Sequence, residues 1–252
     1  MIANVLCVNG GGLIRTAGGL RFVNPPLGGA RYCNAQVDDY QGLPRRSFLH
    51  RPPLRLALRA RFSHPAGVLS GTAGFGFWND PFLMTDLRAP MLPCALWFFY
   101  AAPPSDMRLA LNTPGHGWKA AALDALRPDA LAVLPLAAFA SPLMRSERFY
   151  RRLWPFFERR FRIAEQLLGE DLLPGGMSAW HEYVLEWGPQ VATFLVDGCV
   201  VLTAPAPRGP LGLVIWLDNQ YLVVHPAGRL RYGLVAKSET QWMEIDDLHL
   251  EM

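Results

Sequence analysis

The chain of 252 residues has no uninterrupted run of about 18 or more apolar residues, the length that a membrane-spanning helix needs. We therefore expect no transmembrane segment. Its first residues also lack a basic stretch followed by a long apolar stretch, which is the pattern of a secretory signal. From this we expect a cytoplasmic protein.

Cysteine is scarce, and its spacing has no metal-binding pattern. The four cysteines, Cys7, Cys33, Cys94 and Cys199, form no C-x-x-C pair. A chain of this size does not need disulfides for stability, so we expect free, mostly buried thiols and no metal site. The glycine-rich stretch at 8–19, VNGGGLIRTAGG, lacks the G-x-G-x-x-G order of a dinucleotide site, and we expect no cofactor.

Charge of one sign is also missing. The chain carries 24 basic and 21 acidic side chains, a net charge of +3. Nucleic-acid-binding proteins concentrate positive charge on a face, and this balance provides no overall surface of that kind. We expect no nucleic-acid partner, and any basic function has to be local.

Apolar and aromatic residues are abundant, at 51% and 12% of the chain, and they occur in short runs separated by glycine and proline. Residues 54–62, LRLALRARF, alternate in the period of two that is typical of a half-exposed strand. Asp197-Gly198 between two apolar runs predicts a tight hairpin. Many short strands with turns between them predict an all-β sandwich or barrel, with loops and edge strands over residues 1–53. The other strand-like runs lie at 71–80, 93–101, 180–187, 192–202, 210–220, 229–236 and 241–251.

A segment over about 119–170 departs from this pattern. Alanine, leucine and arginine replace the strand signals, and the apolar residues of 147–168 fall largely at helical spacing. Pro155 is expected to start or kink a helix, and Gly169 to end one. We interpret the segment as a helical insertion that forms a lid or a flank of the single domain 1–252.

Two motifs resemble a known family. WHEYVLEW at 180–187, followed by TFLVDG at 193–198, is similar to paired strands of concanavalin A-like sandwiches, particularly of family-16 glycoside hydrolases. The closing IDDLHL at 245–250 resembles the last strand of that fold. The resemblance covers roughly residues 54–118 and 178–251. It implies a concanavalin A-like jelly-roll β-sandwich interrupted by the helical insertion.

The carboxylates of that family are missing from their expected place. Retaining hydrolysis needs two carboxylates about 5 Å apart, supplied in the family by an E-x-D-x-E strand upstream of WHEYVLEW. No such triplet occurs there. Glu244 and Asp246 have a similar spacing but lie on the closing strand, where a bulge at Asp246 and Asp247 would explain the switch in apolar parity. The resemblance therefore implies the scaffold and not the usual hydrolytic mechanism.

A repeated pattern supplies the candidate site. On residues 71–80, Gly74, Gly76, Trp78 and Asp80 share one strand face, and on residues 210–220 the same order recurs. Small residues would leave room for a ligand, tryptophan offers a flat surface for stacking, and aspartate offers an acid or base. The alternative is that each tryptophan is an ordinary core residue. The predicted catalytic residues are Asp80 and Asp218, and the predicted ligand-binding residues are Trp78, Trp97, Trp216, Gln220, Glu186 and His181.

Two of these candidates rest on weaker arguments. His181 alternates with apolar residues, which is also typical of a buried, hydrogen-bonded histidine. Glu186 shares the other face of its strand with Glu182, and this pair would be an acid and a base only if that face is concave. The seven arginines between Arg145 and Arg162 are typical of a solvated helix face, but they also suit a lid or peripheral contact with an anionic membrane surface.

Three hypotheses for function follow. The first is a carbohydrate-binding or carbohydrate-active sandwich with a concave aromatic face. The second is a lidded small-molecule enzyme, of isomerase or cyclase type, in which a carboxyl group acts on a largely apolar substrate. A lid favours the second, because excluding water raises the pKa of a carboxyl. The third, a purely structural sandwich, would leave the two Trp-x-Asp strands unexplained.

Overall fold

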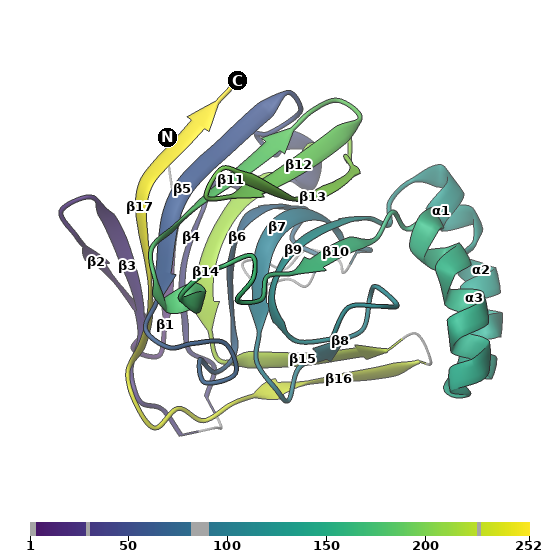
Figure 1. The fold of residues 1–252 in the computed structure, drawn as a ribbon, viewed down its shortest axis with the longest axis horizontal. Coiled ribbons are helices and arrows are strands. Elements are labelled where there is room, and N and C mark those ends of the chain that lie inside the picture. Colours follow the sequence, from purple (N-terminus) through teal and green to yellow (C-terminus); the bar gives the residue numbers. More distant parts are fainter. Residues whose placement is uncertain (1–3, 29–30, 82–90, 226–227) are drawn as a thin grey trace.

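The computed structural model describes residues 4–28, 31–81, 91–225 and 228–252. Two seven-stranded antiparallel sheets face each other in this part of the chain (Figure 1). The strands of the first sheet, in spatial order, are β1 (Asn4–Val8), β4 (Asn34–Asp38), β14 (Gly212–Asp218), β6 (Thr72–Trp78), β7 (Cys94–Ala101), β9 (Gly117–Asp124) and β10 (Ala164–Leu167). The strands of the second sheet are β13 (Cys199–Pro205), β12 (Val191–Val196), β11 (His181–Trp187), β5 (Leu54–Phe62), β17 (Gln241–Glu251), β3 (Gly19–Asn24) and β2 (Gly12–Arg15).

Consecutive strands repeatedly change sheets, as the steps from β4 to β5 to β6 and from β13 to β14 show. This connectivity confirms the predicted all-β jelly-roll sandwich of the concanavalin A type. The inward faces of the two sheets meet in a core with an aromatic centre. There the ring of Tyr183 from β11 lies 5.2 Å from Phe75, 5.0 Å from Phe98 and 5.7 Å from Trp118, centroid to centroid.

A third, three-stranded sheet lies against the first sheet on the side away from the second (Figure 1). It consists of β16 (Arg229–Leu234), β15 (Gln220–His225) and the two-residue β8 (Asp106–Met107). β15 begins two residues after β14 ends, so the chain leaves the first sheet and crosses in front of it. This crossing creates the covered face on which the candidate site lies.

The helices occupy a shorter segment than the sequence predicts. They are α1 (Pro128–Ala132), α2 (Leu134–Ala140) and α3 (Glu147–Arg160), with 3₁₀ turns at Arg45–Ser47, Leu143–Arg145 and Gly176–Ser178. The predicted boundaries of about 119–170 are wrong, because β9 and β10 occupy both ends. Gly169 ends no helix, and Pro155 lies inside α3. α3 buries Tyr150, Trp154 and Phe157, which recur at helical spacing.

Two local predictions are confirmed and one is wrong. Asp197 and Gly198 both have positive φ and join β12 to β13 as a hairpin. The pairing of β17 with β5 shifts register between Asp246 and His249, which is the predicted bulge. Residues 1–53, however, are more than loops and edge strands, because β4 and β3 lie inside the two sheets.

Candidate functional site

A chamber of about 250 Å³ lies between the outer face of the first sheet and the third sheet. β14, β6 and β7 supply an aromatic floor, because the side chains of a strand alternate and every second residue faces outward. β15, β16 and the segment around β8 supply the roof. The floor side chains are Trp78, Trp97, Phe99 and Trp216, the roof side chains are Met107, Leu109, Leu222, Val224 and Leu230, and the polar side chains are Gln36, Thr72, Asp218 and Gln220; Pro93, Leu123 and Tyr221 complete the lining.

The floor is a closely packed aromatic layer. The rings of Trp78 and Trp216 are parallel within 5°, with centroids 6.1 Å apart, and Trp97 lies 5.8 Å from each of them. Two of the indoles are fixed by hydrogen bonds: Trp78 Nε1 donates to Tyr40 Oη at 2.8 Å, and Trp216 Nε1 donates to Thr72 Oγ1 at 3.0 Å. The rings therefore present a rigid apolar surface to the chamber.

The sequence suggested that the glycines of β6 leave open space for a ligand. They do not, because the aromatic layer and the neighbouring strand pack directly against them. A Cβ atom added at Gly74 would lie 2.8 Å from Cη2 of Trp216 and 2.4 Å from the carbonyl oxygen of Phe98. A Cβ atom at Gly76 would lie 2.6 Å from Cα of Trp97. The room that small residues provide is occupied by neighbouring strands and by the indole of Trp216.

Asp218 is the carboxyl group of the chamber. It is buried at the end of β14, where its Oδ1 accepts hydrogen bonds from Thr72 Oγ1 at 2.8 Å, from the Gln220 amide at 3.0 Å and from the Thr72 amide at 3.3 Å. Burial raises the pKa of this carboxyl to about 6, although these hydrogen bonds and the charge of Lys237 oppose the rise. Since all three bonds end on Oδ1, Oδ2 is the atom that can accept or give a proton.

Lys237 contacts the backbone of Asp218 and places a positive charge near its carboxyl group. Its Nζ is buried and donates to the backbone carbonyl oxygen of Asp218 at 3.1 Å. Burial lowers the pKa of the Lys237 ammonium to about 8, while the nearby Asp218 charge opposes that change. A lysine at this place was not predicted, because it reaches the end of β14 from a loop 19 residues further along the chain.

The structure brings together five of the predicted site residues. Trp78, Trp97, Trp216, Asp218 and Gln220 all line the chamber. The pattern that predicted them was the parity of β6, β7 and β14, and the antiparallel pairing of these strands places their outward residues side by side.

Asp80 is not part of this group. Trp78 is paired with Gly212 and Thr72 with Asp218, so Asp80 follows the opposite end of the strand pair. Six residues of strand separate the two ends, which is roughly 20 Å. Asp80 is buried with positive φ, and its carbonyl oxygen accepts a hydrogen bond from Arg45 Nη2 at 2.6 Å. Asp80 and Asp218 therefore do not form a catalytic pair.

His181 and Glu186 lie on β11 of the second sheet, away from the chamber. His181 faces the core side, where its Nδ1 is 2.6 Å from Oδ2 of Asp197 and its Nε2 is 3.1 Å from the carbonyl oxygen of Gly176. Glu186 is exposed on the outer side of β11. Strand parity showed which residues share a face but not which sheet that face belongs to, and the placement of these two in one site with the tryptophans is wrong.

The roof was missed by the sequence reasoning. Leu222 and Val224 of β15 share one parity, and this was the available signal, but nothing local indicated that the strand crosses the first sheet. The predicted helical lid is replaced by this β roof, and no residue of α1, α2 or α3 lines the chamber. Within the described ranges the helices flank the sandwich.

A buried ion pair fixes the segment that carries β8. Lys119 Nζ of β9 lies 3.3 Å from Oε2 of Glu165 of β10, and both side chains are almost fully buried. Burial lowers the pKa of the lysine and raises that of the glutamate. The same Oε2 accepts the amide of Ala110 at 3.4 Å, which attaches the roof segment to the first sheet.

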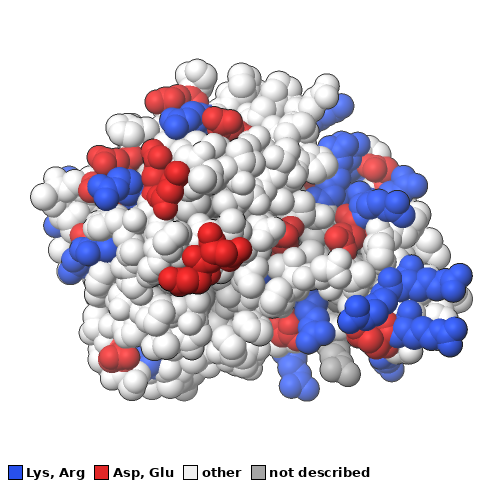
Figure 2. Space-filling view, in the orientation of Figure 1, with Lys and Arg blue, Asp and Glu red and all other residues white. Residues whose placement is uncertain are grey.

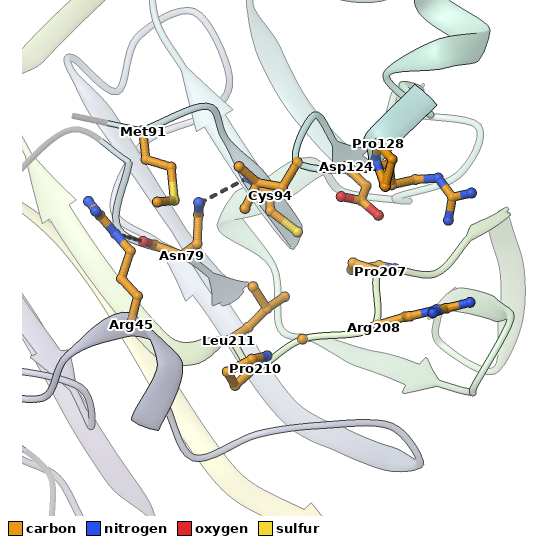
Figure 3. A pocket seen from close by; sticks show the side chains of 13 residues that line it. Arg45, Asn79, Met91, Cys94, Asp124, Pro128, Pro207, Arg208, Pro210 and Leu211 are labelled. Carbon is orange, nitrogen blue, oxygen red and sulfur yellow. Dashed lines mark hydrogen bonds between the residues drawn. The ribbon is translucent and has the colours of Figure 1, made fainter. Parts of the chain in front are cut away.

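A second cavity, of about 460 Å³, lies at the other end of the sandwich (Figure 3). Asn79 Oδ1 accepts the amide of Cys94 at 2.9 Å, and Asp124 and Arg208 approach the cavity from separate segments. Burial raises the pKa of the Cys94 thiol well above its usual value, and the adjacent Asp124 carboxyl adds to the effect. This thiol is therefore protonated at neutral pH and is a poor nucleophile.

Comparisons with known proteins give a likeness of fold only. No family model matches the chain, and no curated protein matches its sequence. Among solved structures, a sialidase is similar at 9% identity and a TM-score of 0.46, over 99% of this chain and 17% of that one. An endo-β-galactosidase from Clostridium perfringens is similar at 12% identity and a TM-score of 0.45, over 96% and 53% of the two chains. An endo-1,3-β-glucanase (laminarinase) from Thermotoga petrophila is similar at 13% identity and a TM-score of 0.46, over 99% of this chain and 90% of that one.

The chain thus spans about a sixth and about half of the length of the first two of these structures. Among the residues that the structure describes, no group of three or more His, Cys, Asp or Glu side chains is placed to hold a metal ion. The chemistry available to the site, as far as its described residues go, is that of the chamber: an aromatic floor, a largely apolar roof and the carboxyl group of Asp218.

Proposed function

We propose that the protein binds a single small, largely apolar molecule in the chamber, with one polar group of that molecule directed at Asp218. The observation that carries this proposal is the covered aromatic face. β15 and β8 cross over Trp78, Trp97 and Trp216, which leaves a partly enclosed space of about 250 Å³. A cavity of this size suits a ligand of one or two rings, since cavities of about 150 Å³ in other proteins accommodate benzene.

The chemistry of the walls supports an apolar ligand. Five aromatic residues and seven other apolar residues line the space, and the polar side chains gather at one end near Asp218. A ligand with hydroxyl groups on every side would lose its hydrogen bonds to water on entering such a chamber, at a cost of about 1–3 kcal/mol for each unpaired group. A ligand with one polar end would not.

Asp218 gives the chamber the means for proton transfer. A carboxyl whose pKa is raised to about 6 exists in both protonation states near neutral pH, which is the condition for an efficient general acid or base. We propose that Oδ2 donates a proton to, or accepts one from, the polar end of the ligand. This corresponds to the isomerase or cyclase type of reaction, with Trp78, Trp97 and Trp216 holding the apolar body.

A carbohydrate ligand is the second candidate, and the parallel rings of Trp78 and Trp216 favour it. Flat indole faces stack well on the apolar side of a sugar ring. The space limits this alternative to one sugar unit. The further units of a longer glycan would have to extend out of the chamber.

Ligand titration of a matched pair of variants tests the proposal. Val224 lines the chamber, and its neighbour Val223 on the same strand does not. The fluorescence of the floor tryptophans is followed while 2-naphthol, a two-ring molecule with one hydroxyl, is added. Eleven heavy atoms at about 0.5 kcal/mol each predict a dissociation constant of about 100 μM for the wild type. Val224→Phe fills the chamber and should weaken binding at least about tenfold, whereas Val223→Phe should not.

The same assay separates the two candidates. Methyl glucoside in place of 2-naphthol should not bind measurably if the ligand is largely apolar. Binding of methyl glucoside that is tighter than that of 2-naphthol, and that Val224→Phe abolishes, would instead support the carbohydrate candidate. Equal effects of Val223→Phe and Val224→Phe on 2-naphthol would mean that the chamber is not the binding site.

A further inference from the structure

The helices flank one end of the chamber and carry an exposed face that the chamber does not explain. On α3, Arg148, Arg152 and Arg159 form one row, because residues four and eleven apart lie on the same side of a helix. This arginine row lies opposite the buried Tyr150, Trp154 and Phe157, and the half-exposed Phe149 lies beside the row, whereas Phe156 packs partly against the buried cluster. Each of the three arginines is exposed.

No acidic side chain of α3 lies on this arginine and phenylalanine face. Glu147 and Glu158 lie on the other side of the helix by their position in the helical repeat. Glu147 is paired with Arg151 at 2.8 Å, and Oε2 of Glu158 accepts the amide of Leu111 at 3.1 Å. Figure 2 shows basic side chains gathered on the side of the molecule where the helices lie. The face is locally positive although the whole chain is nearly balanced.

The preceding helix presents a second exposed apolar stripe. Leu136, Phe139 and Leu143 lie within about 60° of one another around the helix axis, because Ser141 and Pro142 continue the helical conformation of α2. The side chain of Phe139 is 77% exposed, and Leu136 and Leu143 are each about half exposed. Large side chains exposed in this way on neighbouring turns indicate an interaction surface.

The geometry points to an anionic membrane surface as the partner of this helical surface, which consists of Leu136, Phe139, Leu143, Arg148, Phe149, Arg152 and Arg159. Arginines attract anionic lipid headgroups, and phenylalanine and leucine insert below them, which is how amphipathic helices lie in a bilayer interface. A nucleic acid would pair with the arginines but would leave Leu136, Phe139 and Leu143 in water. Their exposure therefore favours the lipid surface.

α3, which carries the docking face, also contacts the roof segment of the chamber. Trp154 Nε1 of α3 donates to the carbonyl oxygen of Leu109, a roof residue, at 2.6 Å. The ring of Tyr150 lies 5.1 Å from that of His225, at the end of β15. Leu230 of β16, which also lines the chamber, is 74% exposed. α3 would thus lie between the bilayer and the roof residue Leu109, a separation of one helix diameter, roughly 10 Å.

The docking of the helices at a membrane would add a source of substrate to the proposed function, and this part of the inference rests on that function. If the chamber binds a largely apolar molecule, its substrate belongs to the class that partitions into membranes, and docking shortens its path from bilayer to chamber. Docking itself does not depend on the ligand. Vesicle binding and 2-naphthol binding are therefore measured separately.

Sedimentation with vesicles tests the docking on the whole protein. Vesicles of phosphatidylcholine are compared with vesicles that also contain phosphatidylglycerol, and binding is expected only to the second kind and to weaken as salt is raised. Arg148→Gln with Arg152→Gln should weaken it about 25-fold, from about 1 kcal/mol for each arginine near an anionic surface. Phe139→Ser should weaken it about tenfold or more, since an inserted phenylalanine contributes at least about 1.5 kcal/mol.

Matched controls come from the opposite side of the molecule. Ile14 is a half-exposed apolar residue of β2, and Arg15 is an exposed arginine of the same strand. Ile14→Ser with Arg15→Gln should leave vesicle binding unchanged. Val224→Phe, which blocks the chamber, should also leave it unchanged, so that a failure of the chamber proposal is distinguishable from a failure of docking.

Three results would overturn the inference. The first is a wild-type protein that does not sediment with phosphatidylglycerol vesicles at low salt. The second is an equal loss of binding in the β2 control and in the helix variants. The third is tight binding to single-stranded RNA that depends on Arg148 and Arg152 but not on Phe139, which would assign the surface to a nucleic acid.

Discussion

Asp218→Asn is the substitution whose effect on stability the structure predicts in most detail. The pKa of this carboxyl is about 6 in the folded chain and 3.8 in its ordinary state. Because each pKa unit corresponds to about 1.4 kcal/mol, ionising Asp218 in its buried position costs about 3 kcal/mol. The folded state holds the proton more tightly, so stability from this group is complete below about pH 4 and is lost as the pH rises to about 6.

An asparagine does not titrate, and its Oδ1 can still accept the hydrogen bonds of Thr72 and Gln220. The free energy of unfolding of Asp218→Asn minus that of the wild type should therefore increase by about 2 kcal/mol between about pH 4 and about pH 6.5. Urea unfolding at several pH values, followed by tryptophan fluorescence, measures this difference. Subtraction removes the contributions of titrating groups that the two proteins share.

The upper limit of about pH 6.5 keeps the measurement clear of Lys237, whose pKa of about 8 would fall further without the Asp218 charge. Asp171→Asn, at an exposed aspartate, is the control for replacing a carboxylate by an amide at the surface. A difference that does not change with pH for Asp218→Asn would refute the assignment of a raised pKa to Asp218, and with it the role of this carboxyl as an acid near neutral pH.

Two further substitutions test the packing around the chamber. Gly74→Ala should lower the free energy of unfolding in urea by about 3 kcal/mol, because its Cβ would meet Trp216 and the Phe98 carbonyl oxygen. Gly12→Ala, where no atom lies within 4 Å of the added Cβ, should have little effect. Similar losses in both variants would contradict the packing argument. Lys119→Met should lower the free energy of unfolding by about 3–5 kcal/mol, because it leaves Glu165 buried and unpaired. Adding Glu165→Gln to Lys119→Met should recover part of that loss. A double variant as unstable as the single one would mean that the ion pair does not hold the roof segment.

The sandwich was predictable because its signals are local. The alternation in 54–62, the Asp197-Gly198 turn and the bulge at Asp246 each depend on a few neighbouring residues, and the structure contains all three. The shared face of the tryptophans and Asp218 also followed from strand parity. These features need no knowledge of which strands pair.

The errors arose where distant segments decide the structure. Residues 117–124, GWKAAALD, contain strong helix formers, but β9 is paired with β7 and buries its small alanines in the sheet, so tertiary pairing overrides the local preference. The roof of the chamber depends on β15 crossing the first sheet, which no periodicity shows. In the same way, the alternation of β11 correctly placed His181 on the apolar face of its strand, but it did not show to which sheet that strand belongs.

A crystal structure of the protein with 2-naphthol bound tests whether the chamber is the ligand site. The rings should lie between the tryptophan floor and Val224 of β15, with the hydroxyl oxygen within hydrogen-bond distance of Asp218 Oδ2. An unoccupied chamber, or 2-naphthol bound instead in the cavity beside Cys94, would contradict the claim that the chamber is the ligand site.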